Sequence, residues 1–280
     1  MVKTRLSLGD IAGQSRVLQV SQMHLDYVVT CRATLVARAK FARANPGEVL
    51  YLNVDGMDQM KTAIPRPRSQ AKANDRGLPL TTKLTGVIDY GRKWYGFWSF
   101  PDLEATSNVT FTVLSRVIRL AQMDRARHGE RFPKKLQLQM DNSGRDNKNH
   151  FLLGYCGLLV AEGVFEEVEA YFLPVGHTHN EIDATFSLVS RAINAQGPLS
   201  LPDLMECAGQ AWRGEHADVG SADKENILLT EVLDFRSALP YRGGPGSSGS
   251  GQTGTVVHRF KGLGSRRTTE EVAGVRVAHR

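Results

Sequence analysis

The sequence has few cysteines and no long apolar run, and both absences narrow the class of protein. Only three of the 280 residues are cysteines, and Cys31, Cys156 and Cys207 lie far apart with no CxxC spacing. A zinc knuckle or a disulfide framework is therefore not indicated, and a reducing compartment is expected. No apolar stretch approaches the roughly 18 residues of a membrane-spanning helix. The segment Met1–Asp10 lacks the apolar core of a signal peptide. We expect neither secretion nor membrane insertion, and a nuclear location in a eukaryote or a cytoplasmic one otherwise.

The composition is that of a globular protein with an excess of positive charge. Hydrophobic residues make up 41% of the chain and the formal net charge is +6. Two segments are dense in basic residues, one after Asp55 (Lys61, Arg66, Arg68, Lys72, Arg76 and Lys83) and one before Asp141 (Arg116, Arg119, Arg125, Arg127, Arg131, Lys134 and Lys135). Such clusters favour a ligand with a phosphate backbone. An ordinary solvated surface is the alternative.

The pattern of apolar residues predicts an α/β domain. Residues 1–46 are predicted to be a helical segment because Val17, Val20 and Val28 recur at helical spacing. Five strands are predicted over 49–55, 84–90, 93–100, 135–141 and 167–175, and helices over 104–128, 148–161 and 201–212 and after 181. The order predicts a mixed five-stranded sheet flanked by helices over residues 47–212. Residues 213–242 are a C-terminal extension, and 243–280 are a Gly/Ser-rich linker and basic tail expected to be disordered.

Three acids stand at the ends of predicted elements. Asp55 and Asp141 each follow an apolar strand, and Glu181 and Asp183 begin a helix. The buried stripe of that helix is predicted to be Ile182, Phe186, Val189 and Ile193. Residues two positions apart differ by about 200° around a helix, so only one of Glu181 and Asp183 can face the other acids. Three clustered carboxylates suit two Mg²⁺ (or Mn²⁺) ions, which prefer oxygen ligands.

Polar residues beside these acids have weaker signals. His177 and His179 form a Gly-His-x-His sequence like the ligand motif of metallophosphoesterases, but the other motifs of that fold are missing. We expect these histidines to support the acids from outside the metal shell, and metallophosphoesterase activity is the less favoured alternative. Asn142 and Lys148 are predicted to hold the loop or contact substrate, and Asp146 or Asn147 is predicted to cap the next helix. The aromatic run 94–98 is predicted to be mostly core.

The placement of the acids resembles a known catalytic pattern. Asp55 on the first strand, Asp141 after the fourth and an acid on the last helix are similar to the DDE/DDD triad of transposases and retroviral-type integrases. Residues 178–191 are similar to the segment of bacterial insertion-sequence transposases in which an acid precedes a Trp/Phe-Ser-Leu-Leu-Lys-Arg helix. More specifically, Asp-Gly-Met-Asp-Gln at 55–59, Asp-Asn at 141–142, Asn-Lys-Asn at 147–149 and Gly-His-Thr-His at 176–179 with Ile-Asp at 182–183 resemble an uncharacterised eukaryotic domain family associated with transposon-derived genes.

The resemblance covers about residues 46–205 and implies a fold, a reaction and a site. It implies a ribonuclease H-like fold and a DDE/DDD-type polynucleotidyl transferase or nuclease that cleaves or joins DNA. It selects Asp183 as the third acid, beside Asp55 and Asp141, and leaves Glu181 in a supporting role. DNA is the expected partner, self-association is allowed, and neither a membrane nor an organic cofactor is expected. The expected DNA contacts are Lys61, Arg66, Arg68, Lys72, Arg145 and Lys148. A catalytically inactive nucleic-acid-binding relic of the same fold is the alternative.

Overall fold

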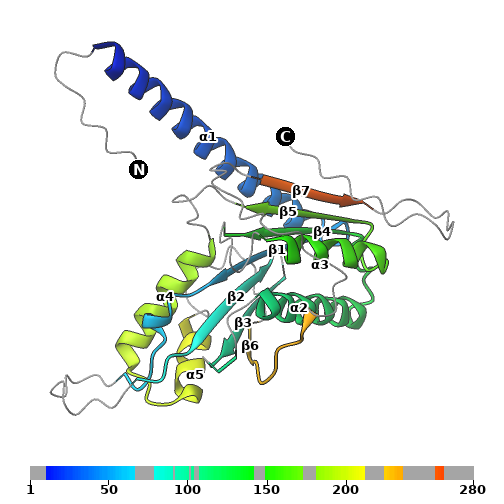
Figure 1. Ribbon diagram of the computed structural model, residues 1–280. Coiled ribbons are helices and arrows are strands. Elements are labelled where there is room, and N and C mark those ends of the chain that lie inside the picture. The colour runs from blue at the N-terminus through cyan, green and yellow to red at the C-terminus, as the bar shows by residue number, and fades with distance from the viewer. Residues whose placement is uncertain are drawn as a thin grey trace.

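A single mixed sheet organises the chain (Figure 1). The computed structural model describes residues 11–66, 79–90, 92–100, 102–103, 107–141, 149–172, 181–211, 224–235 and 256–261. Within them, seven strands have the order β6-β3-β2-β1-β4-β5-β7. Their bounds are β1 Val49–Gly56, β2 Lys83–Asp89, β3 Lys93–Ser99, β4 Lys135–Met140, β5 Glu167–Phe172, β6 Lys224–Leu228 and β7 Val256–Lys261.

The strand directions follow from the connections. β1, β2 and β3 are consecutive and pair antiparallel, whereas β4 pairs parallel to β1 and β5 pairs parallel to β4. Parallel neighbours need a crossover, and helices provide it here. Helix α2 (Ser107–Arg127) joins β3 to β4, and α3 (His150–Ala161) joins β4 to β5. The central strand β1 therefore has β2 on one side and β4 on the other.

Helices cover both faces of the sheet, and each face has its own apolar core (Figure 1). Side chains alternate along a strand, so Leu50, Leu52 and Val54 of β1 enter the core under α2 and α3. On the opposite face, helices α4 (Glu181–Gln196) and α5 (Leu201–Ala211) pack against β1, β2 and β3. The predicted stripe of α4 is confirmed, because Ile182, Phe186, Val189 and Ile193 are all buried.

Helix α1 (Ile11–Ala44) confirms the predicted N-terminal helical segment. Its C-terminal end packs on the sheet through buried Ala39 and Ala42. Its N-terminal half runs away from the sheet (Figure 1), and Leu18 there is 70% exposed. No helix in the described ranges is long and apolar enough to cross a membrane. The mixed sheet flanked by helices and the N-terminal helix are thus as expected.

Two strands were not expected. β6 lies in the segment predicted as a C-terminal extension, and it pairs parallel to β3. β7 lies in the segment predicted to be a disordered linker and tail, and it pairs antiparallel to β5 along its whole length. Both corrections have one cause. Each strand forms by pairing with the exposed edge of a distant strand, and such pairing leaves little local pattern in a segment of five or six residues.

The cap of α3 also differs from the prediction. The helix begins at His150, and Asn149 is its N-cap, where the side-chain oxygen accepts from the Leu152 N–H at 3.0 Å. The Asn149 amide also donates to Ser107 Oγ at 2.8 Å, which links the starts of α2 and α3. The predicted caps Asp146 and Asn147 lie outside the described residues. The aromatic residues of β3 are core as predicted, since Trp94, Tyr95, Phe97 and Trp98 are all buried.

Candidate active site

Asp55 and Asp141 lie at the same end of two neighbouring parallel strands. Val54 of β1 is the register partner of Met140 of β4. Asp55 is the next residue after Val54, and Asp141 is the next residue after Met140. The carboxyl ends of parallel strands meet at one edge of a sheet, so the two acids lie together there. Both are partly buried. The same pattern positions both acids: alternate apolar residues of each strand are buried in the core, and the aspartate follows the last of them.

Asp183 reaches the same end of the sheet through α4. The helix is seated by Phe186, whose ring lies against Gly86 of β2. Gly86 pairs directly with Asp55 in the β1–β2 register. A Cβ atom at Gly86 would lie only 3.0 Å from two carbons of the Phe186 ring. The missing side chain at Gly86 therefore lets α4 approach the sheet beside Asp55, with Asp183 in its first turn.

Asp141 and Asp183 both affect the pKa of Asp55. Burial raises the pKa of Asp55 from 3.8 to about 7, the Gly56 N–H that donates to Oδ1 at 2.8 Å opposes the rise, and the charges of Asp141 and Asp183 add to it. A low-dielectric site disfavours a carboxylate, and neighbouring carboxylates disfavour it further. Asp141 and Asp183 therefore both act on Asp55.

Glu181 has a different partner from Asp183. Its Oε2 accepts from Arg43 Nη2 of α1 at 3.0 Å, and both side chains are partly exposed. Asp183, two residues later, acts on Asp55 instead. The two acids of the first helical turn are therefore divided between α1 and the sheet edge, in line with their angular separation on the helix.

The three carboxylates are of the ligand type that a hard divalent cation prefers, although they do not yet lie close enough together to form a metal site. Three carboxylates supply the oxygen ligands that Mg²⁺ and Mn²⁺ prefer. Burial is the main cause of the raised pKa of Asp55, and the charges of Asp141 and Asp183, which such a cation would balance, add to the rise. Among the described residues, however, no three His, Cys, Asp or Glu side chains already form a group that could hold a metal ion. Any ligands from 142–148 and 173–180 lie outside that search.

Many of the other predicted site residues fall outside the described part of the chain. These are Asn142, Arg145, Lys148, His177, His179, Arg68 and Lys72. Lys61 lies at the end of a short 3-10 helix (Gln59–Lys61) and is exposed. Asp58, from the Asp-Gly-Met-Asp-Gln sequence, caps that helix by accepting from Met60 N–H at 3.0 Å. Arg66 donates to the Lys61 carbonyl at 2.7 Å and so helps to fold the segment.

The second basic segment is largely occupied by ion pairs. Arg125 forms a buried pair with Asp89 at 3.0 Å, and Lys134 pairs with Glu166. Lys135 lies 3.1 Å from the buried carboxylate of Glu169. The density of basic residues over 116–135 thus reflects internal pairing as well as surface charge. Internal pairing therefore accounts for part of this cluster, and its contact with a phosphate backbone stays a prediction.

Several polar residues beside the acids were not predicted from the sequence. Asn53 and Gln139 are each 1% exposed and lie two positions before Asp55 and Asp141. Tyr51 and Tyr90 stack with ring centroids 4.7 Å apart near them. The signal in the sequence was a polar residue at every second position of two apolar strands, which places them on the face that bears the acids.

Comparison with known families places the chain in a family without adding an activity. Residues 72–242 match the model described as Domain of unknown function (DUF7869). The chain belongs to the DUF7869 family. The match contains Asp141 and Asp183, whereas Asp55 and α1 lie before its start. No curated protein matches the chain, and no solved structure matches it. For this DUF7869 protein, function has to be argued from the site.

Proposed function

We propose that this chain is a transposon-derived, divalent-metal-dependent domain that cleaves or transfers DNA strands, built on a ribonuclease H-like fold. The observation that carries the proposal is the charge coupling of Asp55 with Asp141 and Asp183 at one end of the sheet. A carboxylate with a perturbed pKa beside other carboxylates at strand ends is typical of catalytic sites. The motif resemblance adds the reaction class, and no comparison adds to it.

The strand arrangement supports the fold part of the proposal. The central five strands have the order β3-β2-β1-β4-β5, and β2 alone runs against the others. In the ribonuclease H-like arrangement the first strand lies centrally, beside the fourth, and the last helix packs near their ends. β1 and β4 have these positions here, and α4, the helix that follows β5 and precedes α5, packs against β1 and β2.

Each aspartate has a defined part in this proposal. Asp55, Asp141 and Asp183 would hold two Mg²⁺ or Mn²⁺ ions through carboxylate oxygens. Such ions supply charge stabilisation to the attacking and departing oxygens of phosphoryl transfer. Asp55 would release its proton on metal binding, because a ligand carboxylate must be ionised. Arg43 would hold Glu181 toward α1, so that this acid does not compete for the metal.

The second candidate is a catalytically inactive DNA-binding relic of the same fold. The specific observation in its favour is that the described residues contain no preformed group of three metal-ligating side chains. The two candidates share their DNA partner and differ in metal dependence. A relic would bind DNA with or without Mg²⁺ and would cleave in neither case.

The experiment is nicking of supercoiled plasmid by the purified chain in Mg²⁺, in Mn²⁺ and in a chelator. The proposal expects conversion to open circles in either metal and none in the chelator. Asp141→Asn is expected to remove the activity without changing the circular dichroism spectrum. DNA binding without nicking in Mn²⁺ would reject the enzyme and support the inactive relic. Nicking by Asp141→Asn would contradict the assigned site.

A further inference from the structure

The face of the sheet beneath α1 carries a row of polar side chains that leads to the acids. Along β1, Tyr51, Asn53 and Asp55 alternate with the apolar residues that enter the core under α2 and α3. Along β4, Gln137, Gln139 and Asp141 do the same. Asn53 and Gln139 are register partners across the two strands. Two amides therefore lie side by side on the face that bears the two aspartates.

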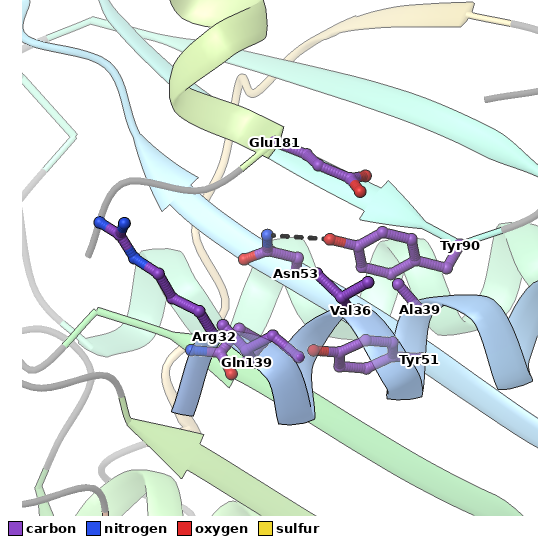
Figure 2. A pocket seen from close by; sticks show the side chains of 9 residues that line it. Arg32, Val36, Ala39, Tyr51, Asn53, Tyr90, Gln139 and Glu181 are labelled. Carbon is purple, nitrogen blue, oxygen red and sulfur yellow. Dashed lines mark hydrogen bonds between the residues drawn. The ribbon is translucent and has the colours of Figure 1, made fainter. Parts of the chain in front are cut away.

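A cavity of about 320 Å³ opens at these amides, between the sheet and the second half of α1 (Figure 2). Its lining is Arg32, Leu35, Val36, Ala39, Tyr51, Asn53, Tyr90, Gln139 and Glu181. The volume is at the small end of the range for ligand pockets. Figure 2 shows Val36 and Ala39 on α1 below Asn53 and Glu181 reaching from α4 above it. The cavity adjoins the candidate active site along the chain. Three of its lining residues, Asn53, Gln139 and Glu181, each stand two positions before one of the three aspartates.

Both amides have an oxygen without a partner in the described part of the chain. Asn53 Nδ2 donates to Tyr90 Oη at 3.4 Å and Gln139 Nε2 donates to the Met140 carbonyl at 3.2 Å. These bonds orient the nitrogens and leave Asn53 Oδ1 and Gln139 Oε1 buried with no hydrogen-bond partner among the described residues. An unsatisfied buried acceptor is costly, so such a pair points to a ligand that donates N–H groups.

The rest of the lining selects a flat ring and a nearby negative charge. Tyr51 and Tyr90 form a stacked aromatic wall at 18° between ring planes. Arg32 contributes a guanidinium to the lining, whereas Arg43, which lies 5.3 Å from the Tyr90 ring centroid, is paired with Glu181. An aromatic wall with a guanidinium group suits a base attached to a phosphate backbone. Amide oxygens favour bases with an exocyclic amine, which thymine lacks.

We propose that this cavity holds one amine-bearing nucleobase, turned out of the DNA strand beside the phosphate that the three aspartates act on. The inference rests on the proposed function for its DNA substrate. Holding a single base would fix the register of the strand, so that one phosphate lies at the carboxylates. Asn53 and Gln139 are then specificity residues, because they read the base and do not touch the reacting atoms.

The test uses fluorescence anisotropy with labelled single-stranded oligothymidine in a chelator, where no cleavage occurs. Four probes differ only at the central position, which holds adenine, cytosine, thymine or an abasic site. The parent is expected to bind the adenine and cytosine probes about five- to tenfold more tightly than the thymine or abasic probe, the effect of one or two buried hydrogen bonds. Asn53→Leu and Gln139→Met are expected to lose this preference and to keep the affinity for the abasic probe.

Gln137→Met is the matched control. Gln137 lies two positions earlier on the same face of β4, but its amide donates to Glu169 at 2.8 Å and it does not line the cavity. It is expected to keep the preference of the parent. Thermal melts should show Asn53→Leu and Gln139→Met close to the parent in stability, since each loses an unsatisfied acceptor together with one hydrogen bond.

Equal binding of all four probes by the parent would overturn the inference, as would a preference that survives both Asn53→Leu and Gln139→Met. Plasmid nicking separates this result from the proposed function. Nicking without base preference rejects the base cavity alone. Base preference without nicking rejects the catalytic proposal and leaves the cavity in place.

Discussion

At the scale of single residues, the protonation of Asp55 is the property of the site that can be measured most directly. Its pKa is about 7 in the folded chain and 3.8 as a free side chain. Between these values the folded chain keeps a proton that the unfolded chain releases, so stability falls as the pH rises from about 4 to 7. Above pH 7 the full cost of the buried charge is present, up to about 4 kcal/mol.

Asp55→Asn is therefore expected to stabilise the metal-free protein at pH 8 and to have little effect at pH 4. Urea unfolding monitored across this pH range measures the difference. Asp58→Asn is the control, because Asp58 is an exposed acid in the same segment whose capping role asparagine can keep. Equal pH dependence of the parent and Asp55→Asn would show that Asp55 is not the strained acid of the site.

The positions of Asp55 and Asp141 at strand ends could be predicted from the sequence, whereas the residues around them could not. Each follows a strand with a clear apolar pattern, and that pattern fixes its place. The pattern of α4 does not choose between Glu181 and Asp183, and the motif resemblance alone selects Asp183. Asn53 and Gln139 are polar residues within buried strands, and their surroundings depend on α1, which packs on them from far away in sequence. A local pattern cannot show which distant helix covers a strand face.

At the scale of elements, the contact between Gly86 and Phe186 sets the position of α4. Gly86→Ala would place a Cβ atom 3.0 Å from the Phe186 ring, and the buried ring has to shift. We expect a loss of about 1–3 kcal/mol in unfolding free energy and a further loss of nicking, because α4 carries Asp183. Chemical denaturation and the plasmid assay measure the two effects.

Gly157→Ala provides the matched control for that substitution. Gly157 lies inside α3, and a Cβ atom added there would meet nothing within 4 Å, so alanine should raise stability by up to about 1 kcal/mol. If Gly86→Ala is as stable and active as the parent, the seating of α4 on β2 does not position the site.

The edge strand β7 is expected to protect β5. Removing residues 243–280 would leave the backbone groups of β5 unpaired at the sheet edge, and open edges promote association. We expect a lower melting temperature and concentration-dependent aggregation by light scattering. A chain that lacks only 262–280 keeps β7 and should behave like the parent, and equal behaviour of both shortened chains would contradict the pairing.

Most of the sheet could be predicted at this scale, and the two outer strands could not. β1 to β5 carry apolar or aromatic runs that identify strands by themselves. β6 has the polar sequence Lys-Glu-Asn-Ile-Leu, and its identity comes from pairing with β3. Pairing between segments more than a hundred residues apart is set by tertiary context, which outweighs local propensity.

At the scale of the whole molecule, the net positive charge is expected to bind DNA through its backbone. The affinity for duplex DNA should fall linearly with salt on logarithmic axes. Lys61→Ala is expected to reduce the slope by about one unit, because Lys61 is an exposed candidate phosphate contact. Lys134→Ala should leave the slope unchanged, because Lys134 is paired with Glu166. Salt-independent binding would contradict a nucleic-acid partner.

The proposed activity depends above all on Asp55, Asp141 and Asp183 forming one metal-dependent catalytic site. The most direct test is the rate of DNA cleavage against Mg²⁺ concentration for the parent, Asp183→Asn and Glu181→Gln. We predict that Asp183→Asn is inactive at every Mg²⁺ concentration while remaining folded, and that Glu181→Gln keeps most of the parent rate, since Glu181 pairs with Arg43. An active Asp183→Asn beside an inactive Glu181→Gln would contradict this assignment and move the third acid by two residues.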